Sequence, residues 1–418
     1  MRNVATCYVE YMKITQKCQM VFNPLPAVVI GGPPHSGKSV LAYSLTRALR
    51  EREVLHYLLR AYPPDYEGDW FQEGERELVR HLRLKGARSE AWLPLLRRDV
   101  ARRHLPLIVD MGGLPTPEQE AVLDDCTHGI LLTPNEKARL EWAVRMARHG
   151  LIVVADLHSE LHGENRLRQQ EPFLRGTLAG LERGRQAEGP AFAALVARLE
   201  GLFAGASGEL RRRHLEGAPA ELAVDLERLA RQVGQDPNRW EPGALPAVLD
   251  YLPAGEPLAL YGRGPNWLYA AAAAHALPAS FFAFDVRLGW VEAPAIGRGR
   301  PTPEAALTVR QRALPGARLV EVGLPDAYVD ITEVDVVRLP RCPAEGVVLS
   351  GKLPQWLWAA LVRGCESAWV AVAQPQVGGA VVVVRREGEG PAVGEVVPVA
   401  AGGRGRWSAM SEFERREE

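Results

Sequence analysis

Short apolar runs alternate with longer amphipathic stretches over the first half of the chain. Five runs between Pro26 and Ala204 are continuous and largely apolar: Ala27–Ile30, Val54–Arg60, Leu107–Asp110, Gly129–Thr133 and Leu151–Asp156. Strands of a parallel sheet that are buried on both faces have this pattern. The stretches Ser39–Arg50 and Asn135–Arg148 instead repeat their apolar positions with the spacing of a helix. The first half therefore predicts a doubly wound α/β sheet with helices between its strands.

The hydrophobic pattern changes after about Ala204. Up to Pro242 the chain is rich in Gly, Ala, Arg and Glu, with one helix expected over Ala220–Gln232. Beyond Pro242 the apolar runs are short, and Pro and Gly are frequent, which is typical of short strands joined by turns. We interpret residues 205–242 as a connector that leads into a module of a different kind.

Two segments of this second module align without gaps at one shared offset. Leu260–Ala271 aligns on Leu349–Ala360, and the same offset aligns Phe281–Gly289 on Val370–Gly378. Each copy predicts a strand, a Gly/Pro turn with one basic residue, a helix that opens with Trp, and a second strand. A shared offset over about thirty positions favours an internal duplication. Two copies of one small unit in a single chain would form a pseudo-dimer.

These patterns divide the chain into parts. We predict an N-terminal extension over residues 1–23, an α/β domain over 24–204, the connector over 205–242, a first repeat over 243–314, a degenerate second repeat over 315–402 and a charged tail over 403–418. The expected fold class is α/β, with the doubly wound sheet followed by two tandem α+β repeats.

Composition limits the class of protein. A hydrophobic fraction of 47% suits packed domains, and a net charge of -1 argues against binding duplex nucleic acid by bulk electrostatics. The five cysteines are scattered and never form a C-x-x-C pair, which excludes a zinc ribbon and a disulfide framework. No apolar run reaches the roughly 18 residues of a membrane span. We therefore predict a soluble, cytoplasmic protein without a membrane partner.

The strongest chemical signal follows the first predicted strand. Gly32-Pro-Pro-His-Ser-Gly-Lys-Ser39 is a complete G-x-x-x-x-G-K-S motif between a strand and a helix, which is the context that a P-loop requires. Glycines let the backbone approach phosphate oxygens, and the helix N-terminus adds positive potential. The expected ligands are ATP and Mg²⁺. The nucleotide-binding residues are predicted to be Gly32, His35, Ser36, Gly37, Lys38, Ser39 and Asp110.

Within this motif, Lys38 is expected to reach the β- and γ-phosphates, and the Ser39 hydroxyl to bind Mg²⁺. A second carboxylate on the metal side should end a buried strand. Asp110 is the first candidate and Asp156 the second, although an Asp at a strand end can also only cap the next helix.

The use that the first domain makes of its nucleotide stays open. Carboxylates that follow the second strand, and arginines beyond the fifth, have the positions of an acceptor site and a lid in small-molecule kinases: Asp65, Glu67, Asp69, Arg175, Arg183 and Arg185. A solvated charged surface explains them equally well. The domain is as similar to small P-loop kinases as to AAA-type ATPases.

The duplicated module resembles the manganese-dependent CRISPR ring nucleases of type III systems. That family has a pattern close to G-R-G-P-x-W-L, followed further on by D-P-R-L-G. Gly262–Leu268 and Asp285–Gly289 match it in the first copy, and Gly351–Leu357 and Gln374–Gly378 match it in the second. The resemblance extends over about 160 residues, from Pro246 to Ala401, with motifs of moderate specificity. It implies a ferredoxin-like fold, degradation of cyclic tetra-adenylate, and Mn²⁺ as cofactor; some members of the family are fused to an AAA-like P-loop domain.

The resemblance also implies roles for particular residues. Asp285 and Arg287 stand on the family's acidic and basic positions, His275 lies close to its histidine, and Asp285 would hold Mn²⁺. In the second copy Gln374 and Gln376 replace the acid and the base, so that copy should bind without catalysing. The substrate-binding residues implied in the two turns are Arg263, Gly264, Pro265, Trp267, Lys352, Leu353 and Pro354. A Trp that opens a helix is, however, more often part of the core.

Three hypotheses from different classes follow. In the first, the chain is a ring nuclease with one competent half-site. In the second, it is a sensor that binds cyclic tetra-adenylate without cutting it and thereby controls its ATPase or kinase domain. In the third, it is a P-loop kinase that acts on a small molecule, and the repeats have a structural role. A homodimer or higher homo-oligomer is expected, because two pseudo-dimers would enclose a ring.

Overall fold

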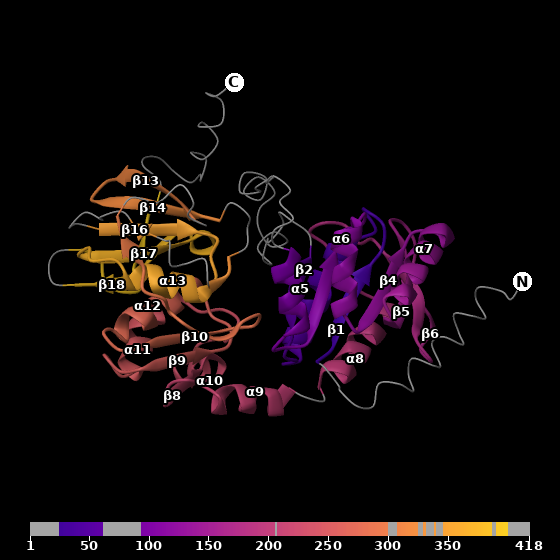
Figure 1. Ribbon diagram of the computed structural model, residues 1–418, viewed down its shortest axis with the longest axis horizontal. Helices are drawn as coiled ribbons and strands as arrows, with labels where there is room; N and C mark the ends of the chain where they lie inside the picture. The colour runs from indigo at the N-terminus through magenta and orange to yellow at the C-terminus, as the bar shows by residue number, and fades with distance from the viewer. Residues whose placement is uncertain are drawn as a thin grey trace, which may run out of the picture. The chain divides into compact units, whose positions relative to one another are not determined.

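The computed structural model describes residues 25–61, 93–204, 207–299, 307–324, 329–331, 338–339, 346–386 and 390–399 (Figure 1). The predicted extension over residues 1–23, the tail over 403–418, and Asp65, Glu67 and Asp69 lie outside these residues. The chain divides into two compact units, Met1–Arg211 and Arg212–Glu418. No single helix among the described residues is long and apolar enough to cross a membrane.

The first unit is built on a seven-stranded sheet in the order β2-β3-β1-β4-β5-β7-β6. Its strands are β1 (Ala27–Gly31), β2 (Tyr57–Ala61), β3 (Leu107–Met111), β4 (His128–Thr133), β5 (Ile152–Glu160), β6 (Arg166–Gln169) and β7 (Leu174–Ala179). All neighbouring strands are parallel except β6, which is antiparallel to β7. The sequence predicted the first five strands, and their apolar residues form the buried sheet. It missed β6 and β7; the β6 segment Arg166–Gln169 has the polar pattern of a loop.

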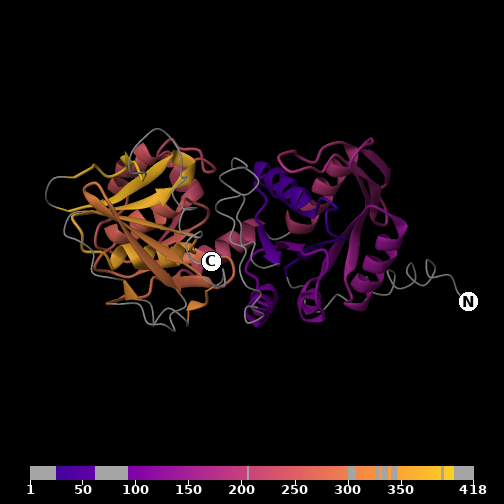
Figure 2. The same ribbon diagram turned by 90° about the horizontal axis from the view of Figure 1, so that it is seen from above.

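Helices cover both faces of this sheet (Figure 2). They are α2 (Lys38–Glu51), α5 (Leu93–Ala101), α6 (Pro117–Glu120), the 3₁₀ helix η1 (Ala121–Asp125), α7 (Glu136–Arg148) and α8 (Pro190–Ala204). On one face Leu45 of α2 and Leu195 of α8 share a buried cluster with Ile30 of β1. On the other face Met146 of α7 fits against Gly129 of β4, where a Cβ atom would lie 2.5 Å from its sulfur. The α/β class is thus confirmed.

The second unit contains two sheets of the same plan. The first has the order β11-β10-β9-β8, and the second has the order β13-β14-β16-β17-β18-β19. The strands are β8 (Leu222–Asp225), β9 (Leu258–Tyr261), β10 (Phe281–Asp285), β11 (Gly289–Glu292), β13 (Thr308–Leu314), β14 (Ala317–Gly323), β16 (Gly346–Gly351), β17 (Trp369–Gln374), β18 (Gly379–Arg385) and β19 (Val396–Val397). A further pair, β12 (Gly297–Arg298) and β15 (Arg338–Leu339), forms a two-stranded sheet.

The duplication is visible in the strand pairing. The strands β8, β9 and β10 are parallel and β11 is antiparallel, just as β14, β16 and β17 are parallel and β18 is antiparallel. Helix α9 (Ser207–Glu216) contains the boundary between the two units. The other helices of the second unit are α10 (Leu226–Gln232), η2 (Pro242–Ala244), α11 (Leu245–Tyr251), α12 (Asn266–His275), α13 (Gln355–Arg363) and η4 (Pro375–Val377). The equivalent helices α12 and α13 pack against each other between the two sheets (Figure 1).

Three expectations about this unit need correction. A ferredoxin-like unit runs strand–helix–strand–strand–helix–strand. In the first copy two helices, α10 and α11, follow the first strand, a single helix follows the second strand, and the last two strands are consecutive, with the first three strands parallel. The presumed connector contains β8, which pairs with β9 and therefore belongs to the first copy. The segment β13, assigned to the first repeat, pairs with β14 in the second sheet.

Candidate functional site

The glycine-rich segment Gly32–Ser39 links β1 to α2. Gly37 takes a left-handed conformation (φ 84°) as the N-cap of α2, and no side chain caps this end of the helix. The first amide N–H groups of a 14-residue helix are therefore available to a ligand, and the helix dipole gives this end a positive potential. Such an end is suited to an anion.

Neighbouring elements fix the shape of this loop. A Cβ atom on Gly37 would lie 2.5 Å from the Cβ atom of Leu181, and Gly113 lies directly against the backbone of Pro34. The Ser159 hydroxyl of β5 donates a hydrogen bond of 2.8 Å to the Ser36 carbonyl. The loop is thus held from three sides, so little reorganisation is needed to present its amides.

Lys38 is folded back onto the same loop. Its ammonium donates to the carbonyls of Gly32 (2.8 Å) and Pro33 (2.7 Å), and the side chain is buried. Burial lowers the pKa of Lys38 to about 8, although the negative charge of Asp110 acts in the opposite direction. With a pKa of about 8, the amino group is mostly charged at neutral pH and loses its proton at moderately higher pH.

Asp110 lies beside the loop. It pairs in register with Ile30 of β1, and its side chain is buried near Lys38. Ser39 stands in the first turn of α2, at the same carboxyl edge of the sheet. Mg²⁺ commonly binds one or two protein oxygens together with substrate phosphates, and this donor set fits that chemistry.

The second carboxylate candidate, Asp156, does not end a strand. It lies inside β5, which continues to Glu160. Its carboxylate pairs with Arg139 (3.2 Å) and Arg175 (3.7 Å), and burial raises its pKa in spite of these arginines. The expectation that Asp156 ends its strand is therefore wrong, and its carboxylate is engaged by Arg139 of α7 and Arg175 of β7.

In the second unit the helices α12 and α13 lie side by side and point the same way. At their N-terminal ends the Gln355 amide donates to the Gly264 carbonyl (2.9 Å). At their C-terminal ends Arg363 donates to the carbonyls of Ala273 (2.9 Å) and Ala279 (2.8 Å). The two predicted turns are therefore neighbours, although 89 positions separate them along the chain.

The two helix N-termini form one positively charged edge. Pro265 and Pro354 are the N-caps of α12 and α13, and neither helix has a side-chain cap. Each turn contributes one cation, Arg263 in the first copy and Lys352 in the second. The partial positive charges of the two helix dipoles add to these cations. This arrangement is suited to a ligand with at least two phosphate groups.

Asp285 and Arg287 form a buried ion pair at the same edge, at the end of β10. Their side chains are 10% and 12% exposed, and Arg287 Nη2 lies 3.3 Å from Asp285 Oδ2. Asp285 also accepts hydrogen bonds from the Arg287 amide (2.8 Å) and from Trp356 Nε1 of the other copy (3.2 Å). Burial alone would raise the pKa of Asp285, but the charge and hydrogen bonds of Arg287 outweigh it and lower that pKa.

These contacts do not fit the implied Mn²⁺ site. Both oxygens of Asp285 already accept hydrogen bonds, and the described residues contain no group of three His, Cys, Asp or Glu side chains that could hold a metal ion. In the second copy Gln374 is partly buried and donates a 2.6 Å hydrogen bond to the exposed Gln376. The expectation that this copy binds without catalysing stays a prediction.

His275 lies far from Asp285 in the fold. It is the last residue of α12, and its Nε2 bonds with the Leu252 carbonyl at 2.9 Å. Because α12 connects two parallel strands, its C-terminal end lies at the edge of the sheet opposite to the end of β10. The three implied catalytic residues are thus not brought together. Sequence proximity misled here, since a ten-residue helix separates its ends by about 15 Å.

The implied aromatic contacts are also absent. Trp267 and Trp356 are 1% and 0% exposed and belong to the common core of the two copies. Leu353 is buried as well, at 9% exposed. Neither Trp can stack on a base, and the core interpretation of these residues is correct. Sequence reasoning missed Gln355, which links the turns; its alignment with Asn266 gave no signal for that contact.

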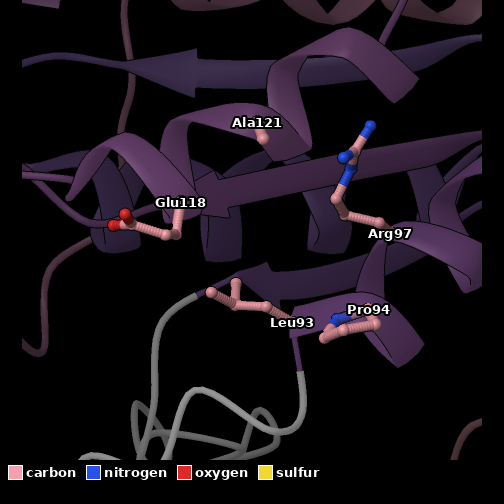
Figure 3. Close-up of a pocket in the computed structure, with 5 residues that line it drawn as sticks. All are labelled: Leu93, Pro94, Arg97, Glu118 and Ala121. Atoms are coloured by element: carbon pink, nitrogen blue, oxygen red, sulfur yellow. The ribbon is translucent and has the colours of Figure 1, made fainter.

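One further pocket lies on the first unit. It has a volume of about 480 Å³ and is lined by Leu93, Pro94, Arg97, Glu118 and Ala121 (Figure 3). Arg97 is engaged by Asp125 at 2.8 Å. None of the predicted site residues lines this pocket.

Comparison with known protein families gives one match. The family described as CRISPR-associated protein (Cas_csx3) matches residues 324–398, which include β16, α13, β17 and β18. No curated protein matches the chain. The second copy of the duplicated module is therefore similar to this family, and the match supports a CRISPR-associated accessory protein.

Proposed function

We propose that this chain is a type III CRISPR accessory protein that binds ATP–Mg²⁺ in its first unit and cyclic tetra-adenylate in its second. The ring site is proposed to bind its ligand without cutting it, so that occupancy of the ring site controls ATP turnover. The observation that carries the ring-binding half is the pair of parallel, uncapped helix N-termini of α12 and α13, each preceded by one cation.

The nucleotide half rests on the strand–loop–helix at Gly32–Ser39. The amides of this loop and Lys38 would bind the phosphates, while Ser39 and Asp110 would hold Mg²⁺. The bound ion would neutralise charge on the β- and γ-phosphates. Leu181, which lies against Gly37, brings the loop that contains Arg183 and Arg185 to the same region.

The ring half rests on charge and symmetry. A cyclic tetranucleotide has four phosphates, and a site made of two matched halves offers equivalent contacts to two of them. Arg263 and Lys352 would each pair with one phosphate, next to the free amides of α12 and α13. The family match on the second copy supports this choice of ligand.

Binding without cleavage is favoured over the nuclease hypothesis by the site around Asp285. Its carboxylate is neutralised by Arg287 and hydrogen-bonded by Trp356, so it is not poised to hold a metal ion or to transfer a proton. His275, which lies close to the family's histidine in the alignment, is at the opposite end of α12. The second copy has glutamines in the corresponding positions.

The ring-binding test uses labelled cyclic tetra-adenylate and the purified full chain. The double variant R263A/K352A should weaken binding by at least about tenfold, because each lost charge-assisted contact contributes roughly 1.5–3 kcal/mol. A matched control removes two exposed arginines from strand β13, Arg310 and Arg312, and should bind as the unmodified protein does. Equal binding by both double variants would contradict the assignment of this site.

The cleavage test uses the same ligand at stoichiometric protein with Mg²⁺ or Mn²⁺. We expect an intact ring after a long incubation, together with a change in ATP turnover when the ring is added. Linear products would restore the ring-nuclease hypothesis. An unchanged ATP turnover would remove the sensor hypothesis while leaving ring binding in place.

A further inference from the structure

The glycine-rich loop contains one residue with a conformation that its side chain disfavours. His35 has a φ of 62°, in the left-handed region, and Glu53 is the other described non-glycine residue with a positive φ. An L-residue in this region costs about 1–2 kcal/mol that a glycine avoids. The loop therefore keeps an unfavourable backbone angle at a position that glycine would fill without strain.

The surrounding structure imposes this angle on His35. On one side Gly113 lies directly against the backbone of Pro34. On the other side Ser159 donates a hydrogen bond to the Ser36 carbonyl, and Gly37 is held against Leu181. The backbone before and after His35 is fixed by other elements, so the residue cannot relax to a right-handed conformation without moving the whole loop.

Nothing in the described structure offsets this cost. The His35 side chain is exposed, and it has no hydrogen bond or ion pair with any residue in the described parts of the chain. By contrast, the Lys38 ammonium, three residues later, is held by the carbonyls of Gly32 and Pro33. His35 is the exposed polar side chain of a loop in which Ser36 and Lys38 are buried. Strain of this kind is characteristic of residues that act on a ligand.

We propose that the His35 imidazole donates a hydrogen bond to the phosphate chain of the bound nucleotide. This inference rests on the proposed ATP site, and it assigns to His35 a contact beyond the backbone amides of the loop. Since an imidazole N–H to a phosphate oxygen is a charge-assisted hydrogen bond, its loss should weaken ATP binding by about tenfold or more.

The experiment measures ATP and ADP affinity by titration calorimetry, and thermal stability without nucleotide, on the full chain. His35→Gly should raise the melting temperature of the unliganded first unit by about 2–4 °C, because about 1 kcal/mol of strain is removed, and should weaken nucleotide binding. His35→Asn provides a second variant, since Asn tolerates the left-handed region but lacks the imidazole. It should lose affinity with a smaller gain in stability.

Glu53→Gly is the matched control. Glu53 also has a positive φ (56°) and an exposed side chain, but it follows the C-terminal end of α2, away from the loop. This variant should not change nucleotide affinity. Unchanged ATP and ADP affinity in both His35 variants would overturn the inference while the ATP site stands. Failure of the unmodified protein to bind ATP would overturn the proposed nucleotide site and the inference with it.

Discussion

Replacement of Asp285 by Asn tests whether this carboxylate is structural or catalytic. The substitution keeps the size of the side chain but removes the charge that compensates Arg287. It also replaces one carboxylate oxygen by an amide NH₂ group, which cannot accept a hydrogen bond. Both oxygens of Asp285 accept hydrogen bonds, one from the Arg287 amide and one from Trp356 of the other copy, so one of these bonds is lost. Because the two ionic side chains are only 10% and 12% exposed, water cannot take over these interactions.

The expected loss of stability is large. Removal of one partner from a buried ion pair costs about 3–5 kcal/mol, because the remaining charge stays buried without compensation. For a unit of this size, a loss of about 3 kcal/mol corresponds to a fall of roughly 6–12 °C in melting temperature. Gln376→Ala, at the position equivalent to Arg287, removes an exposed side chain and should change the free energy of unfolding by no more than about 0.5 kcal/mol.

The assay is differential scanning calorimetry of the full chain with and without saturating ATP, which shifts only the transition of the unit that binds it. The double variant D285N/R287M should recover part of the lost stability, since it removes both charges.

The stability that Asp285 contributes should depend on pH. The pKa of Asp285 is lowered in the folded state, so its stabilising effect is present above the unfolded value of about 4 and disappears as the pH falls through the folded pKa. The difference between D285N and the unmodified protein should therefore shrink below about pH 4.

One result would refute this reasoning. If D285N unfolded at the temperature of the unmodified protein but lost a measurable ring-cleaving activity, Asp285 would be catalytic. The ion pair with Arg287 would then contribute little to stability.

Three further predictions concern single residues. Lys38→Ala should abolish measurable ATP binding in calorimetry and leave ring binding unchanged; loss of both in a folded variant would contradict separate sites. The pKa of Lys38 is about 8, and phosphates bind the charged form of its amino group. The ATP affinity of the unmodified protein should therefore fall as the pH rises above 8. An ATP affinity that stays constant up to pH 9.5 would argue against Lys38 as a phosphate ligand. Gly37→Ala should lower both the ATP affinity and the melting temperature, since its Cβ atom would lie 2.5 Å from Leu181 and the φ of 84° disfavours a side chain. A melting temperature equal to that of the unmodified protein would contradict this close packing.

The first five strands, the turn and the helix of the N-terminal unit were predictable because they depend on local pattern. Apolar runs such as Leu107–Asp110 are typical of strands buried on both faces. The strand β6 was not predictable, since the polar segment Arg166–Gln169 lies at a sheet edge and, among the described strands, pairs only with β7. The duplication could also be predicted from the sequence, because the two copies have similar residues at positions with one shared offset.

The limits of the repeats needed the three-dimensional pairing. The segment Leu222–Asp225 has no counterpart in the alignment, and it becomes part of the first copy only by lying parallel to β9. The ferredoxin-like fold was expected from the family resemblance, and the strand pairing of the first copy differs from it. Short shared motifs do not specify which strands are neighbours. That choice depends on the direction in which each connection crosses the sheet.

The amino-acid sequence alone determined the α/β class, the glycine-rich loop between β1 and α2, and the two related Pro-Trp turns, since each of these depends on residues close together in the chain. Only the tertiary structure decided which side chains meet. It joined Trp356 to Asp285 and Gln355 to Gly264, and it separated His275 from Asp285 by the length of a helix. The physical reason is that contacts between distant segments follow from the packing of α12 against α13, and the packing geometry of two helices is not encoded in the local pattern of either.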